Sequence, residues 1–112
     1  MDLVSLVDKT LSPLKIPVLW QIRPGKFPGI SYHFFNESGI LFGDGEVERM
    51  TVSCQVDIWS KDGHENIKKE VKKLMKKSRF LEPYSYDGYE KEVKLYHTVM
   101  VFNYHYKEGE TR

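Results

Sequence analysis

The sequence is poor in the features that most readily point to a function. Cys54 is its single cysteine, so no disulfide can form within the chain, and a reducing, intracellular setting is indicated. Its formal net charge is +1, too small for a global field that would gather nucleic acid or an anionic membrane. No apolar run is long enough to span a membrane, and the N-terminus lacks the basic and apolar regions of a secretory signal.

Signatures of catalysis are also scarce. The chain has no GxSxG elbow and no glycine-rich phosphate loop, and Cys54 stands at an apolar position of an alternating stretch, as a small buried hydrophobe would. None of the histidines has a partner at the spacing of metal ligands: His33, His64, His97 and His105. We therefore predict that the protein is not an enzyme and has no metal, cofactor or small-molecule substrate.

What the sequence does have is a long strand over 46–60, in which apolar and polar residues alternate. The apolar positions are Met50, Val52, Cys54, Val56 and Ile58. The opposite face includes Asp57 and Trp59, and this face is either solvated or a binding surface. Our hypothesis is that Asp57 and Trp59 contact another subunit.

An amphipathic helix follows this strand. Its apolar residues stand at i, i+4, i+7 and i+8, namely Ile67, Val71, Leu74 and Met75. Asp62 and Glu65 resemble the capping box found at the start of many helices. Period and cap together predict a helix that ends near Lys77.

Lysines cover the polar side of this helix: Lys68, Lys69, Lys72, Lys73, Lys76 and Lys77. Their four like-charged i,i+4 pairs cost about 0.2–0.5 kcal/mol each, whereas each buried apolar side chain contributes about 1.5–3 kcal/mol, so the helix should still form. Two interpretations stay open. Either the lysines are a solvated face, or they bind an acidic partner or nucleic acid with an affinity that falls with salt.

The remaining elements are shorter or less regular. A first helix has apolar residues at Leu3, Leu6, Val7 and Leu11 and is expected to end at Pro13. Asp44 and Gly45 predict a tight turn that joins two strands into a hairpin. The other expected segments are a strand over 16–22, a second over 30–36 that continues toward the turn, an irregular stretch over 80–90, a last strand over 92–106 and a short polar tail from about 107.

These elements predict one α+β domain over residues 1–112, in the order α-β-β-β-α-β. Its mostly antiparallel sheet would have about four to five strands, with both helices packed on one face. Because Val99 and Val101 oppose Met100 and Phe102, the last strand should be central or covered by another subunit.

The hairpin looks too long for the domain. A strand over 46–60 would be roughly 50 Å long, whereas a domain of this size is roughly 35 Å across. The hairpin should therefore project and place its tip, Ile40, Leu41 and Phe42, on a neighbouring subunit. The alternative is a sharply bent hairpin whose tip folds onto its own sheet.

Aromatic residues occupy several strand positions: Tyr32, Phe34, Tyr96, Phe102 and Tyr104. We interpret them as core residues and cross-strand pairs. A surface that stacks single-stranded bases is the alternative, but the basic-Gly-aromatic signature of the RNA-recognition motif is absent and the net charge is near zero. Nucleic acid is therefore not the expected partner.

The pattern as a whole resembles a known family. The strand end QVDIWS at 55–60, the short polar turn, the amphipathic helix and the late strand end NYHY at 103–106 resemble the tail completion or tail terminator proteins of long-tailed phages. The proline-flanked stretch 16–21, followed by ISY at 30–32, is also similar to the early strands of that family.

The resemblance implies a structural protein of a phage or prophage. Members of this family are α+β domains that form a ring, commonly a hexamer, at the end of the tail tube, where they stop tube growth and join tail to head. The implied partners are other copies of the chain, the tail tube protein and head-tail connector proteins, with no membrane. The implied location is the host cytoplasm during assembly and then the tail-head junction of the virion.

Two hypotheses from different classes follow. The first is this ring-forming virion-assembly protein, built through strand-edge and hairpin contacts. The second is a small non-enzymatic binding module for an acidic partner or single-stranded nucleic acid, using the lysine-rich helix and the aromatic sheet. The number of subunits, and its response to salt, distinguishes the two.

Overall fold

The chain forms an α+β fold, as the sequence predicts. This computed structural model describes residues 2–43, 45–63 and 65–107, apart from the side chains of residues 41, 42, 47 and 48. No helix in this part of the chain is long and apolar enough to cross a membrane. In chain order the elements are α1 (Leu3–Leu11), the short 3-10 helix η1 (Ser12–Leu14), β1 (Val18–Trp20), β2 (Gly29–Gly43), β3 (Glu46–Ser60), α2 (Glu65–Lys77), β4 (Tyr84–Glu90) and β5 (Leu95–Lys107).

The five strands make one sheet in the order β1-β2-β3-β5-β4. Only the short pair β1 and β2 is parallel, and all the other pairs are antiparallel. β5 lies between β3 and β4, which confirms the prediction of a central last strand. Both of its faces are apolar because Met100 and Phe102 lie on one side of the sheet and Val99 and Val101 on the other, all four buried.

Three expectations about local structure are wrong. The stretch 80–90 is not irregular throughout, because β4 runs from Tyr84 to Glu90 and the turn comes later, at 91–94. The first strand is short, since Gln21 has a φ of 64° and leaves the extended region. Asp62 does not cap α2: it lies before the helix, in a turn where its backbone N–H donates to Ser60 Oγ at 3.1 Å.

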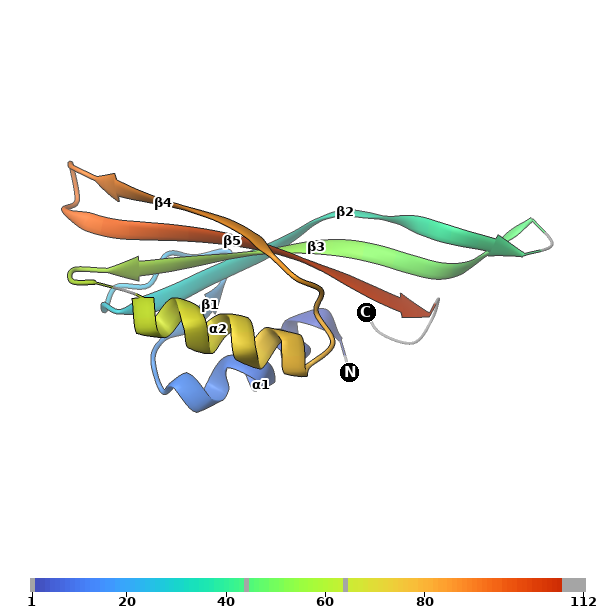
Figure 1. The fold of residues 1–112 in the computed structure, drawn as a ribbon, viewed down its shortest axis with the longest axis horizontal. Helices are drawn as coiled ribbons and strands as arrows, with labels where there is room; N and C mark the ends of the chain where they lie inside the picture. The colour runs from blue at the N-terminus through green and yellow to red at the C-terminus, as the bar shows by residue number, and fades with distance from the viewer. Residues whose placement is uncertain (1, 44, 64, 108–112) are drawn as a thin grey trace.

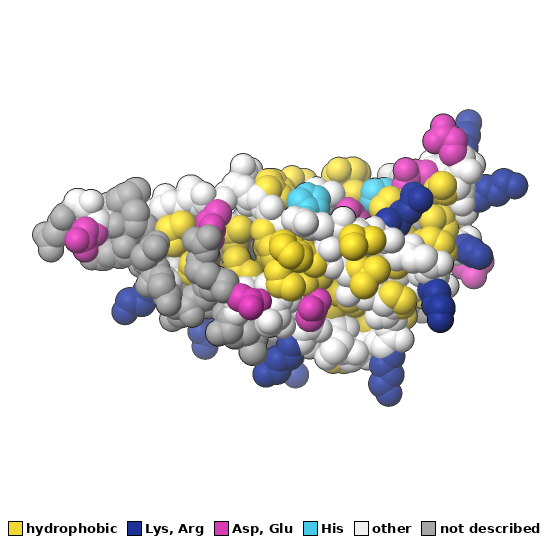
Figure 2. Space-filling view, turned by 180° about the vertical axis from the view of Figure 1, so that it is seen from behind, with side chains coloured by type: hydrophobic (Ala, Val, Ile, Leu, Met, Phe, Trp, Pro, Cys, Tyr) yellow, Lys and Arg dark blue, Asp and Glu magenta, His cyan; other side chains and the backbone are white. Residues whose placement is uncertain are grey.

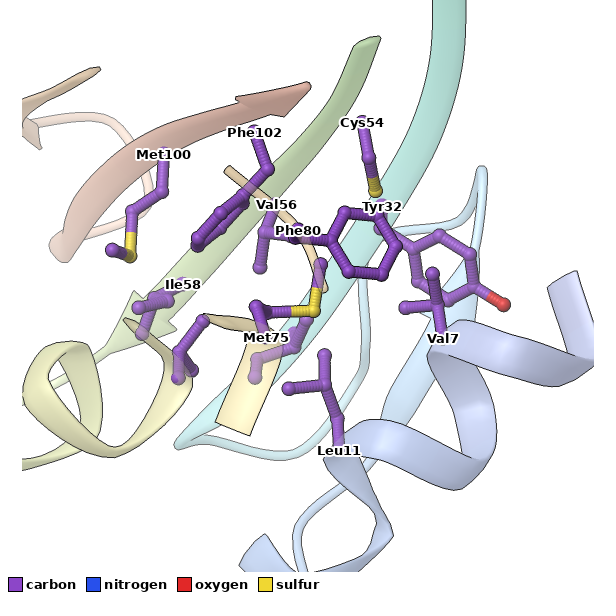
Figure 3. Close-up of a cluster of buried hydrophobic side chains, with 12 residues drawn as sticks. Val7, Leu11, Tyr32, Cys54, Val56, Ile58, Met75, Phe80, Met100 and Phe102 are labelled. Carbon is purple, nitrogen blue, oxygen red and sulfur yellow. The ribbon is translucent and has the colours of Figure 1, made fainter. Parts of the chain in front are cut away.

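Both helices cover the same face of the sheet (Figure 1), as predicted. Their spaced apolar side chains, Val7 and Leu11 from α1 and Val71 and Met75 from α2, are fully buried. They pack against the alternate apolar residues of the central strands (Figure 3). Burying such a side chain contributes about 1.5–3 kcal/mol, so this layer holds the helices to the sheet. Cys54 is one of its buried members, as the sequence predicts.

The β2–β3 hairpin projects from the body (Figure 1), as the strand lengths predict. The molecule measures 52 × 24 × 22 Å along its principal axes. β1 pairs with β2 only at residues 30–32, and β5 pairs with β3 only as far as Arg49. Residues 40–43 and 45–48, which we call the arm, therefore extend as a two-stranded ribbon beyond the rest of the sheet. The bent hairpin is not found.

Candidate interaction surfaces

The arm is the first candidate surface. Across it β2 and β3 pair with register shifts, Leu41 opposite Arg49 and Phe42 opposite Val47. Ile40 exposes 44% of its surface, which is high for a large apolar residue. The predicted contacts of the Leu41 and Phe42 side chains lie outside the described residues. Contiguous exposed apolar surface marks an interface, and Ile40 is the described apolar side chain that would contribute to one on the arm.

Two strand edges form the second candidate surface. β4 is an edge strand, and from His33 to Gly43 the outer edge of β2 has no strand partner in the described chain. Backbone N–H and C=O groups along such edges can pair with a strand of another chain. The sheet can therefore be extended on both sides.

The helix-free face of the sheet is the third. Ser31, Asp57 and Trp59 lie on this face at their register positions, with His97 opposite Trp59. Seen from behind (Figure 2), hydrophobic side chains gather over the middle of the molecule, with histidine side chains next to them. The exposed tyrosines of β4, Tyr84 and Tyr86, extend the aromatic character of the surface.

At Asp57 and Trp59 this face is largely buried within the chain instead of solvated. Asp57 is 9% exposed and Trp59 is 8% exposed. The Trp59 indole stacks on the His97 ring at 3.8 Å between centroids, and its Nε1–H donates to Ser31 Oγ at 3.1 Å. Gln55 Nε2 donates to Asp57 Oδ1 at 2.9 Å. Both residues are thus engaged within the chain, and their contact with another subunit stays a prediction.

His97 completes a polar cluster that the sequence analysis missed. Its Nε2 lies 3.4 Å from Asp57 Oδ1, and its Nδ1 lies 3.3 Å from Glu90 Oε2. Glu90, His97 and Asp57 come from three strands, so only the strand register could have brought them together. In the part of the chain that the structure describes, no group of three such side chains is arranged to hold a metal ion.

Most of the predicted aromatic residues are core residues, which confirms that interpretation. Tyr32 and Phe102 are fully buried, and the Tyr32 hydroxyl donates to Asp8 Oδ1 at 2.8 Å. The Tyr104 ring contacts Phe80, with 4.6 Å between centroids. Tyr96 is instead 41% exposed and contacts Tyr89 from the neighbouring strand. Tyr32 and Phe102 are therefore not accessible for base stacking, whereas the exposed tyrosines lie on β4 and at the start of β5.

The lysines of α2 divide into two rows. Lys72 and Lys76 both bind Glu82, at 2.5 and 2.6 Å, and Lys68 lies 3.6 Å from Asp87 Oδ2. Hydrogen bonds from Lys72 and then Lys76 hold the pKa of the Glu82 carboxyl below its usual range. This row is therefore neutralised within the chain, at least in part.

The second row consists of Lys69, Lys73 and Lys77, one helical turn apart from each other. Lys69, Lys73 and Lys77 are exposed, and no described residue makes an ion pair with them. Neither of the two earlier interpretations treats the lysines as different from each other. The structure separates a row of lysines that make ion pairs from a row that makes none with the described residues.

No protein-family model and no curated protein matches this sequence.

Proposed function

We propose that this protein is a structural assembly protein of a phage or prophage, a tail terminator that forms a ring at the end of the tail tube. In this role it stops tail growth and joins the tail to the head. Its partners are further copies of itself, the tail tube protein and the head-tail connector proteins. It acts in the host cytoplasm during assembly and then at the tail-head junction of the virion.

The projecting arm is the observation that carries this proposal. A 52 Å molecule with a 24 × 22 Å cross-section presents Ile40 on a ribbon outside its own core. A ring is built from heterologous contacts, in which one surface of a subunit meets a different surface of the next. An arm that reaches away from its own domain supplies such a contact, because it can cross to a neighbour.

The strand edges support the same function. β4 and the outer edge of β2 lie on opposite sides of the sheet, and both can accept a strand. A subunit with a single open strand edge would form a dimer and leave no edge for further subunits. Two different open edges allow each subunit to bind the next one head to tail. The arm and the two open strand edges together fit a ring of subunits better than a monomer.

The second hypothesis, a binding module for an acidic ligand or single-stranded nucleic acid, gains less support. Lys68, Lys72 and Lys76 already have acidic neighbours in the chain. Tyr32 and Phe102 are in the core, where they cannot stack on bases. We therefore do not advance this function.

Deleting residues 39–45 tests the proposed function. The deletion removes most of the arm and leaves the pairing of β3 with β5 in place, so the domain should still fold. We expect rings of the intact protein by electron microscopy and a mass by light scattering that falls to that of a monomer in the deletion variant. Circular dichroism checks that the variant is folded. If the folded variant forms the same oligomer as the intact protein, the proposed assembly through the arm is contradicted.

A further inference from the structure

A groove lies between the two helices, and no residue that the structure describes fills it. It has a volume of about 450 Å³ and is lined by apolar side chains, Leu6 and Pro13 on the α1 side and Leu74 on α2. Thr10 and Ser78 also line the groove, and they connect the two helical segments because Thr10 Oγ1 donates to Ser78 Oγ at 2.9 Å. A groove of this size can hold more than one apolar side chain.

Basic side chains border this groove. Lys9 from α1 and Lys77 from α2 are among its lining residues. Lys77 belongs to the row that has no ion pair among the described residues, and Lys73 lies one turn before it. The groove therefore combines apolar lining residues with positively charged ones, which favours an occupant that has both apolar and acidic side chains.

The arm has this composition. Residues 40–48 include three acidic residues and no basic one: Asp44, Glu46 and Glu48. The same stretch has the apolar residues Ile40, Leu41, Phe42 and Val47. Among the side chains that the structure describes, Ile40 and Glu46 are exposed.

We infer that the arm of one copy of this chain docks in the α1–α2 groove of a second copy. Apolar arm residues fill the groove, and arm carboxylates pair with Lys9, Lys73 and Lys77. This inference rests on the proposed ring, and it names the surface of the neighbour that receives the arm. Opposite charges on the two surfaces set the register and steer association, and apolar burial supplies the larger part of the affinity.

The occupant is a second copy because the arm cannot serve its own groove. β2 and β3 pair continuously from the sheet into the arm, apart from local register shifts, and carry it away from the domain that holds both helices (Figure 1). Docking between copies is also directional, since arm and groove are different surfaces. Repetition of such a contact generates a ring or an open filament.

Two charge-reversed proteins test the inference. The first is Glu46→Lys/Glu48→Lys, whose arm becomes basic, and the second is Lys73→Glu/Lys77→Glu, whose groove border becomes acidic. In each protein alone, arm and groove have the same sign, so we expect the mass to fall about sixfold from a hexamer to the monomer. Mixed one to one, arm and groove are again complementary at every contact, and we expect the oligomer to return.

A matched control for Lys73→Glu/Lys77→Glu makes the same change in net charge at a site away from the groove. Lys61→Glu/Lys91→Glu alters exposed turn residues and should leave the oligomer intact. A disulfide test is independent of charge: in Ile40→Cys/Leu74→Cys, oxidation should link different copies, whereas Ile40→Cys/Lys61→Cys should not.

Failure of this inference can be told from failure of the proposed function. If the wild type forms rings and the Lys73→Glu/Lys77→Glu protein forms them equally well, the groove assignment is overturned and the ring stands. If the wild type is a monomer, both are overturned. Failure of the mixed proteins to associate, with each folded by circular dichroism, also contradicts the docking.

Discussion

Among single residues, Cys54 shows how its surroundings decide the chemistry of a reactive side chain. It is fully buried in the layer between sheet and helices. Burial, and to a lesser degree the charge of Asp57, raises the pKa of the Cys54 thiol above its ordinary range. Because the thiolate is the reactive form, this cysteine should be inert as long as the core is closed.

Labelling with Ellman's reagent measures this inertness. At pH 8 we expect no reaction of Cys54 in the native protein and one thiol per chain after denaturation. A cysteine placed on the surface by Lys61→Cys should react at once under native conditions. Rapid native labelling of the wild type would show that the core opens far more often than its packing implies.

The hydrogen bond between Trp59 and Ser31 is a second feature at this scale. Ser31→Ala removes the acceptor and leaves the indole N–H without its partner in a buried position. We expect the free energy of unfolding to fall by about 1–3 kcal/mol in urea titrations. Ser53→Ala is the matched control, because its hydroxyl donates to Asn103 at an exposed site, and a change within about 0.5 kcal/mol is expected there. Equal effects of the two substitutions would contradict this account of Trp59.

Among the elements, α2 depends on residues outside itself. Its apolar side packs on the sheet, and its lysines are partly neutralised by Glu82 from the segment that follows. A single carboxylate bound to both Lys72 and Lys76 also fixes the chain where it leaves the helix. The connection between α2 and β4 is thus held by charge as well as by the burial of Phe80.

This arrangement predicts a pH dependence. The pKa of Glu82 is lowered in the folded state, so its contribution to stability is present at neutral pH and is lost as the pH falls through that lowered pKa. We expect Glu82→Gln to lower the melting temperature slightly at pH 7 and low salt, and the difference from wild type to vanish toward acid pH. Glu92→Gln, in the exposed turn before β5, serves as the control. A difference that persists unchanged in strong acid would rule out the charge pairs as its cause.

How far the sequence predicts the elements depends on the regularity of each. α1, β3 and α2 are predicted because a single period runs through each of them and matches the face they bury. β4 is missed because Pro83 and the pair Asp87–Gly88 are turn signals, and because nearly all of its residues are exposed and lack alternation.

Parts of the candidate surfaces could not be predicted for a related reason. Lys72 and Lys76 differ from Lys73 only through the position of Glu82, which the helical pattern does not contain. The stack of Trp59 on His97 likewise depends on the register between β3 and β5. The arm was predictable because strand length alone, compared with domain size, determines that it projects.

For the whole molecule, shape and surface are compatible with the proposed self-assembly. The arm leaves the domain, both sheet edges are open, and the groove between the helices has the charge opposite to that of the arm sequence. Together they are the features that the proposed contacts between copies would use.

The mass of the intact protein in solution tests this account most directly. Native mass spectrometry and light scattering over a wide range of concentrations should give a closed oligomer, and a hexamer of 13.2 kDa subunits would have a mass of about 79 kDa. Particles of that mass should appear as rings in electron micrographs. A protein that stays a 13.2 kDa monomer at every concentration would contradict the account.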